Sequence, residues 1–211
     1  MGSLRGYFSN WVGQRRSPDI KIFFIGFNRC GTNSFHQLMK GSGIRSVHWL
    51  SPRKENITDG IEARLADRQA LREYLSPWTA FSDLVSASET RFVEGNGFFP
   101  AFHDAFPQSY FVLNDRDVEA WLRSRVQHSN GTFLQRAMAY HGADKEQVLD
   151  IWRRQHAEHT AKALDHFAGN PRFIHFRIDR DPIERMVSFL APDFTISPSD
   201  WMVHKKSKAS A

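Results

Sequence analysis

The apolar stretch KIFFIGF (21–27) contains one glycine near its end, and a second glycine and a group of short polar side chains follow it; together they could bind an anion. Gly26 and Gly31 allow the backbone to turn tightly before a helix begins. The first N–H groups of a helix have no partners within it and lie at the positive end of the helix dipole. With the charge of Arg29, this pattern predicts a phosphate-type binding loop. A glycine turn that joins a strand to a helix without any ligand is the alternative. The candidate ligands of the loop are Arg29, Cys30, Gly31, Thr32, Asn33 and Ser34.

The loop keeps the glycine spacing of the Walker pattern G-x-x-x-x-G-K-[ST] but not its chemistry. Thr32 stands where that pattern has the lysine that reaches the β- and γ-phosphates. Asn33 stands where the pattern has the hydroxyl that holds magnesium. We therefore expect a ligand with a 5′-phosphate, without β- and γ-phosphates and without a need for a metal ion.

A second basic motif follows another buried strand, in the stretch SYFVLNDRDVEAWLRSR (109–125). Arg116 comes directly after that strand, at the edge where open α/β sheets bind their ligands. Ser124 lies about two helical turns further on, so it could meet the same phosphate as Arg116. The sequence spacing makes this convergence possible without proving it.

The two motifs resemble those of sulfotransferases that use 3′-phosphoadenosine 5′-phosphosulfate (PAPS). The stretch IGFNRCGTNS (25–34) is similar to the family's 5′-phosphosulfate loop, and Arg29 occupies the position of the family's lysine. The stretch FVLNDRDVEAWLRSR (111–125) is similar to the family's 3′-phosphate motif, with Arg116 and Ser124 at matching positions. The segments HWLSP and AFSDL also look like those of small bacterial members. The resemblance implies PAPS as co-substrate, adenosine 3′,5′-bisphosphate as product, and no metal.

The resemblance also implies a mechanism in which an acceptor hydroxyl attacks the sulfur in line. The acceptor would be a carbohydrate or another small molecule, and Arg29 would stabilise charge on the bridging oxygen. A general base would take the acceptor's proton, and the family's bases come from about the positions of His48 and Asp83. A histidine with an ordinary pKa of ~6.5 suits neutral pH, whereas an aspartate needs a pKa raised by burial. His48 therefore ranks slightly ahead of Asp83.

These residues need a scaffold that brings them to one edge of a sheet. Strands are predicted over 21–27, 44–50, 78–84, 109–115 and 172–179. Helices are predicted over 32–43, 61–75, 117–130, 145–169 and 181–191, with a short one near 99–106 in a segment that otherwise reads as loop. Such alternation is typical of an α/β three-layer sandwich, with a central parallel sheet flanked by helices, of the P-loop nucleotide-binding type.

The composition is that of one globular domain. The chain has 211 residues, 41% of them hydrophobic and 24% charged, and no linker divides it. We therefore expect a single domain over 1–211, with a flexible basic tail from about residue 203. The net charge of +5 suggests anionic partners, but basic and aromatic residues do not alternate as they would on a nucleic-acid surface.

The expected location is the cytoplasm. The sequence shows no signal peptide and no run of the ~18 apolar residues that a membrane span needs. Its one cysteine, Cys30, cannot form an intramolecular disulfide, which fits a reducing compartment.

Two other functions stay open at this point. The strand YFVLND resembles the acid-ended strand of P-loop phosphotransferases, so a nucleotide kinase is one alternative. A non-catalytic nucleotide-binding module is the other. His156, His159 and His166 share one predicted helix, but without H-E-x-x-H spacing they read as a solvated face, and we expect no metal site.

Overall fold

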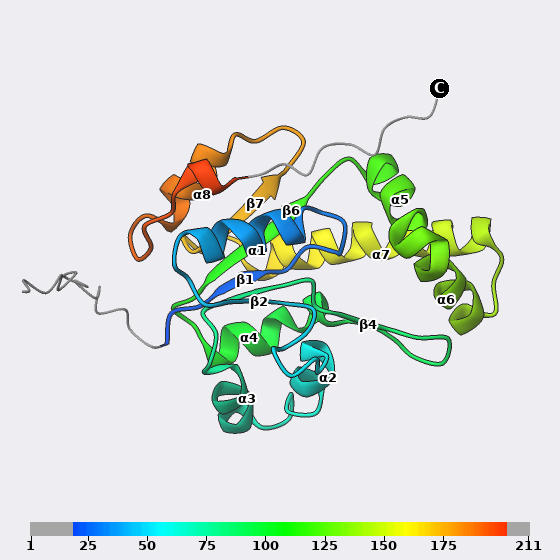
Figure 1. Cartoon of the computed structure of the whole chain (residues 1–211), viewed down its shortest axis with the longest axis horizontal. Coiled ribbons are helices and arrows are strands. Elements are labelled where there is room, and N and C mark those ends of the chain that lie inside the picture. Colours follow the sequence, from blue (N-terminus) through cyan, green and yellow to red (C-terminus); the bar gives the residue numbers. More distant parts are fainter. Residues whose placement is uncertain (1–18, 202–211) are drawn as a thin grey trace, which may run out of the picture.

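The computed structural model describes residues 19–201, so the tail expected from about residue 203 lies outside the described residues. Its centre is a five-stranded parallel sheet in the order β2-β3-β1-β6-β7 (Figure 1). The strands are β1 (Ile22–Phe24), β2 (Ser46–His48), β3 (Ala80–Ser82), β6 (Tyr110–Asp115) and β7 (Phe173–Arg177). All five predicted strands are confirmed, each within a shorter range than the apolar pattern gave.

Helices cover both faces of the sheet and make it the middle of three layers (Figure 1). They are α1 (Thr32–Gly41), α2 (Ile57–Glu62), α3 (Arg68–Leu75), α4 (Phe99–Ala105), α5 (Val118–Val126), α6 (Thr132–His141), α7 (Lys145–His166) and α8 (Ile183–Leu190). Three short 3₁₀ helices are η1 (Gly95–Phe98), η2 (His128–Gly131) and η3 (Pro198–Asp200). The α/β three-layer fold predicted from the sequence is therefore confirmed.

Alternating side chains of the central strand build two separate cores. Ile22 and Phe24 of β1 pack on one face with residues of α1 and α8. Phe23 and Ile25 pack on the other face with residues of α2, α3, α4 and α7. Because successive side chains of a strand point to opposite faces, a continuous apolar run is what a sheet covered on both sides requires.

Three features differ from the pattern-based prediction. The helix predicted over 61–75 falls in two separate helices, α2 and α3. Asp67 accepts a hydrogen bond from the N–H of Ala70 and so caps the N-terminus of α3. The segment predicted as loop contains part of an antiparallel hairpin, formed by β4 (Val85–Ala87) and β5 (Phe92–Glu94). Helix α6 follows a turn in which Ser129 and Asn130 adopt positive φ, and the sequence had not indicated it.

The hairpin is held against the helices by a buried cation. Arg125 of α5 is fully buried and forms an ion pair with Glu94 of β5. Its guanidinium carbon lies 4.9 Å from the ring centroid of Trp121 and 4.5 Å from that of Trp152. This contact joins α5, α7 and the hairpin into one unit beside the sheet.

No helix within residues 19–201 combines the length and the apolar character needed to cross a membrane.

Candidate functional site

The loop between β1 and α1 is shaped by buried contacts to the strand and helix of the second motif. The side chain of Asn114 accepts a hydrogen bond from the N–H of Gly26 at 2.9 Å and donates one to the carbonyl of Cys30 at 2.9 Å. The indole N–H of Trp121 donates to the carbonyl of Asn28 at 2.9 Å. A Cβ on Gly26 would lie 1.7 Å from the carbonyl oxygen of Asn114, so only glycine fits there. The first loop and the second motif are therefore one structural unit.

The same bonds fix the direction of the loop's peptide groups. Three successive carbonyls, those of residues 28–30, accept hydrogen bonds from Trp121, Arg116 and Asn114. Gly31 has a φ of +78° and precedes α1 without a side-chain cap. Carbonyls turned toward β6 and α5 favour N–H groups on the opposite side of the loop, at the positive end of α1. Thr32 and Ser34 are buried in this first turn, and Asn33 is exposed.

The second motif meets the loop at Arg29. The Nε of Arg29 donates a hydrogen bond to the Oγ of Ser124 at 3.1 Å. The Nη1 of Arg116 donates to the backbone carbonyl of Arg29 at 3.3 Å. Arg29 itself is exposed and has a φ of +69°, a left-handed conformation that is uncommon for a residue other than glycine. The structure thus brings Arg29, Arg116 and Ser124 together.

The two candidate bases lie side by side at the carboxyl ends of β2 and β3. The Nε2 of His48 is 3.5 Å from the Oδ2 of Asp83, and its Nδ1 is 3.1 Å from the Oγ of Ser82. The other carboxyl oxygen of Asp83, Oδ1, accepts a hydrogen bond from the hydroxyl of Thr32 at 3.1 Å. Asp83 therefore connects His48 to the candidate anion-binding loop.

Burial moves the two pKa values in opposite directions. It lowers the pKa of His48 to about 4, which corrects the ordinary histidine value assumed from the sequence. It raises the pKa of Asp83, although the hydrogen bond from Thr32 and the charges of His128, Arg29 and Arg125 act against that rise. His48 is consequently neutral near pH 7, and Asp83 has the raised pKa that an aspartate base would require.

Two residues at this edge have unusual backbone conformations. Asp83 and Trp49 each have a φ of +58°, and for a bulky tryptophan this is a strained conformation. Trp49 is held there because its N–H donates to the carbonyl of Ser82 at 3.2 Å and its carbonyl accepts from Ile57 at 3.0 Å. Its side chain is 46% exposed, so an indole faces solvent beside the candidate base.

His128 is a residue of this region that sequence reasoning missed. Burial lowers its pKa, and the charges of Arg29, Arg125 and Arg136 lower it further, while Asp83 opposes them. Its ring centroid is 5.3 Å from that of Phe133. His128 follows α5 in a turn that no recognisable motif marks, so no sequence signal pointed to its place near Asp83 and Arg29.

Asp115, the acid at the end of β6, is occupied by other contacts. Its Oδ1 is 2.8 Å from the Nε2 of His156, and its Oδ2 is 2.9 Å from the Nε2 of His175. Burial raises the pKa of Asp115, but these hydrogen bonds outweigh it and hold the pKa well below its usual range. His156 and His159 therefore serve the fold, since the Nε2 of His159 donates to the carbonyl of Ile25 at 2.6 Å. The solvated face predicted for them from the sequence is wrong, because both side chains are largely buried against the sheet and α5.

Among the described residues, neither the single cysteine nor the acidic and histidine side chains add a further reactive or metal-binding group. Cys30 is 1% exposed, and burial raises the pKa of its thiol far above the ordinary value, so no thiolate is available at neutral pH. Within residues 19–201 no three His, Cys, Asp or Glu side chains are grouped in a way that could hold a metal ion.

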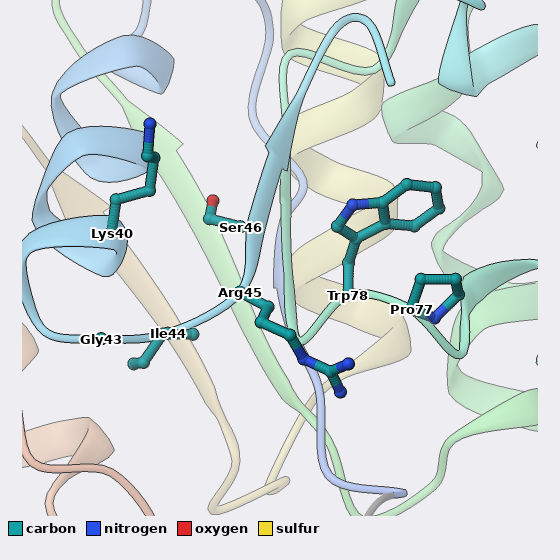
Figure 2. A pocket seen from close by; sticks show the side chains of 7 residues that line it. All are labelled: Lys40, Gly43, Ile44, Arg45, Ser46, Pro77 and Trp78. Carbon is teal, nitrogen blue, oxygen red and sulfur yellow. The ribbon is translucent and has the colours of Figure 1, made fainter. Parts of the chain in front are cut away.

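A separate hollow lies at the opposite end of the strands (Figure 2). It sits where β2 begins and where the chain leads into β3, whereas the loop and the second motif lie at the carboxyl ends of the strands. It contains none of the candidate residues described above. The residues that line it are Lys40, Gly43, Ile44, Arg45, Ser46, Pro77 and Trp78.

A family model described as a sulfotransferase domain matches residues 21–177, well over half of the chain. The chain therefore belongs to the sulfotransferase family, and it is a transferase of the sulfuryl-transferring class. The matched range contains the loop, the second motif and both candidate bases. No curated protein matches the chain.

Proposed function

We propose that this protein transfers the sulfuryl group of PAPS to a hydroxyl group of an acceptor, which is a carbohydrate or another small molecule. The observation that carries the proposal is that the loop and the second motif meet at Arg29. The side chain of Arg29 donates a hydrogen bond to Ser124, and its carbonyl accepts one from Arg116. PAPS has two anionic groups, a 5′-phosphosulfate and a 3′-phosphate. The loop would bind the first, and Arg116 with Ser124 would bind the second.

The proposed site residues have separate roles in the reaction. The acceptor oxygen attacks sulfur, the bond from sulfur to the bridging oxygen breaks, and adenosine 3′,5′-bisphosphate leaves. The exposed Arg29 and the N–H groups at the start of α1 would stabilise the charge on that oxygen. A neutral His48 can accept the acceptor's proton, and Asp83, 3.5 Å away, is the second candidate for this step.

The kinase alternative has two observations against it. Thr32, at the position of the Walker lysine, is bonded to the carboxyl group of Asp83, so an acid lies where a triphosphate needs a cation. Asp115, at the position of the acid that would help to hold magnesium, uses both oxygens for His156 and His175. A non-catalytic module would have no need of two candidate bases beside the loop.

The single cysteine of the sequence, buried and unpaired, fits a reducing compartment, and we place the enzyme in the cytoplasm.

A binding experiment without metal tests the proposal. Adenosine 3′,5′-bisphosphate in EDTA should raise the melting temperature, because a ligand that binds only the native state stabilises it by mass action. ATP with magnesium should raise it much less. Equal stabilisation by the two ligands would favour the kinase, and no stabilisation by the bisphosphate would reject PAPS as the donor.

A further inference from the structure

Asp83 places an acidic group beside the point where the donor's terminal group would lie. We propose that Asp83 is a specificity-determining residue, whose carboxylate admits a sulfuryl group and rejects a phosphoryl group at the end of the donor. This inference rests on the proposed use of PAPS. It predicts that PAPS binds well and that its phosphoryl analogue, adenosine 3′-phosphate 5′-diphosphate, binds poorly.

Asp83 contacts the loop directly. Its Oδ1 accepts the hydrogen bond from the hydroxyl of Thr32 at 3.1 Å, and Thr32 is the first residue of α1. In the Walker pattern this position carries the lysine that contacts the β- and γ-phosphates. Where the Walker pattern has a cation near the terminal phosphate, this chain therefore has the hydroxyl of Thr32, bonded to the carboxyl group of Asp83.

The two terminal groups differ in charge although they are similar in size and shape. A sulfuryl group on a bridging oxygen carries one negative charge. A terminal phosphoryl group carries two above its second pKa, which lies near ~6 for a phosphate monoester. Repulsion between like charges grows when water is partly excluded, and the Asp83 side chain is 14% exposed. The second charge of the phosphoryl group is therefore the one that the carboxylate opposes.

Burial raises the pKa of Asp83, and its polar and charged neighbours act against that rise. Thr32 donates a hydrogen bond to it, and the positive charges that act on it are those of Arg29 and Arg125, with His128 when protonated. His48, at 3.5 Å, is the titratable neighbour on β2. The same cations that attract the donor would thus favour the carboxylate against the effect of burial, and a measurement at pH 8 favours it further.

The backbone holds this carboxyl group in place. Asp83 has a φ of +58°, and its carbonyl accepts a hydrogen bond from the N–H of Val85 at 2.9 Å. Asparagine adopts the left-handed region as readily as aspartate. Asp83→Asn therefore removes the charge while the shape of the turn is preserved.

Calorimetric titration at pH 8 in EDTA tests the inference without any acceptor. The ligands are PAPS, adenosine 3′-phosphate 5′-diphosphate and adenosine 3′,5′-bisphosphate. The wild-type protein should bind PAPS at least tenfold more tightly than the diphosphate. In Asp83→Asn that gap should close to about threefold, mainly through tighter binding of the diphosphate. Asp104→Asn, which removes an exposed carboxylate paired with Arg68 at 3.6 Å, should leave the gap unchanged.

The outcomes separate this inference from the proposed function. If the bisphosphate binds but the wild-type protein does not distinguish PAPS from the diphosphate, Asp83 has no selective role. A gap that persists in Asp83→Asn also rejects the inference. Failure of both PAPS and the bisphosphate to bind rejects the proposed function, and this inference with it. Should Asp83→Asn not fold, Asp83→Ser provides the same loss of charge.

Discussion

The Nε of Arg29 donates a hydrogen bond to the Oγ of Ser124 at 3.1 Å, although the two residues lie in different motifs on different elements. This bond crosses from the loop after β1 to the last turn of α5. The carbonyl of Arg29 is at the same time held by Arg116. The two proposed phosphate-binding elements are therefore already in contact, and the proposed donor with its two anionic groups should need little reorganisation of the protein to bind.

The first prediction concerns the 3′-phosphate. Arg116→Ala should weaken binding of adenosine 3′,5′-bisphosphate much more than binding of adenosine 5′-phosphate, which lacks the 3′ group. Loss of such a charge-assisted contact costs on the order of 1.5–3 kcal/mol. Titration calorimetry measures both ligands, and the control is Arg123→Ala, which changes an exposed arginine of α5, the helix that follows Arg116. Equal weakening of both ligands would make Arg116 a structural residue that only supports the loop.

A second prediction separates binding from chemistry at Arg29. This residue is proposed to act on charge that develops as the sulfuryl group departs. Arg29→Ala should keep affinity for the bisphosphate product within about tenfold, or 1.4 kcal/mol. Turnover of PAPS should fall by a larger factor, measured as product release in the presence of an acceptor. A loss of product affinity as large as the loss of turnover would assign Arg29 to ground-state binding alone.

The sheet could be predicted from the sequence because its strands are encoded locally. Continuous apolar runs such as 109–115 identify strands buried on both faces, and the glycine spacing identifies the loop. The hairpin of β4 and β5 was missed because its strands are only partly buried, lack a continuous apolar run, and are held by Arg125, a contact between distant segments. Short strands stabilised in this way leave no periodic pattern to read.

Sequence motifs could predict which candidate residues lie near one another but not their electrostatics, and the roles of these residues stay predictions. Arg29, Arg116, Ser124, His48 and Asp83 were all identified from motifs and strand ends, and the structure groups them. The low pKa of His48 depends on burial, which no local pattern reports. The hydrogen bond from Thr32 to Asp83 likewise joins the start of α1 to the turn after β3 through two side chains, and sequence spacing cannot show it.

Gly26 gives a prediction about the shape of the loop. Gly26→Ala would place a Cβ 1.7 Å from the carbonyl oxygen of Asn114, so the loop must move. We expect a loss of stability of about 1–3 kcal/mol, as for other overpacked sites, together with a large loss of affinity for the bisphosphate. Gly97→Ala, where a Cβ meets nothing within 4 Å, is the matched control. Denaturant unfolding and calorimetry measure the two effects, and normal binding by Gly26→Ala would mean that the loop tolerates displacement.

The lowered pKa of His159 leads us to expect a loss of stability in acid. Burial lowers its pKa to about 4, so the folded protein keeps it neutral where the unfolded chain protonates it, below ~6.5. The unfolded state then binds more protons, and the free energy of unfolding must fall as the pH falls from 6.5 toward 4. One such group contributes at most ~1.4 kcal/mol per pH unit. His159→Gln should make urea unfolding between pH 6.5 and 5 less dependent on pH, and an unchanged slope would contradict a neutral buried His159.

The last prediction identifies the base. If His48 takes the acceptor's proton, His48→Gln should lower turnover by about 10²–10⁴-fold, the usual effect of removing a general base. Bisphosphate affinity should stay within about tenfold, because the proton step does not involve the product's phosphates. The low pKa of His48 adds a distinctive feature, since it is set to about 4 by burial. Wild-type activity should therefore decline only as the pH approaches 4, not near the ordinary histidine value, and this acid limb should disappear in His48→Gln.

If His48→Gln stays active while Asp83→Asn is inactive with product binding intact, Asp83 is the base, and its raised pKa should then set the acid limb instead. Activity in both variants would place the proton on water or on a third group, for which His128 is the nearest choice by its electrostatic coupling to Asp83.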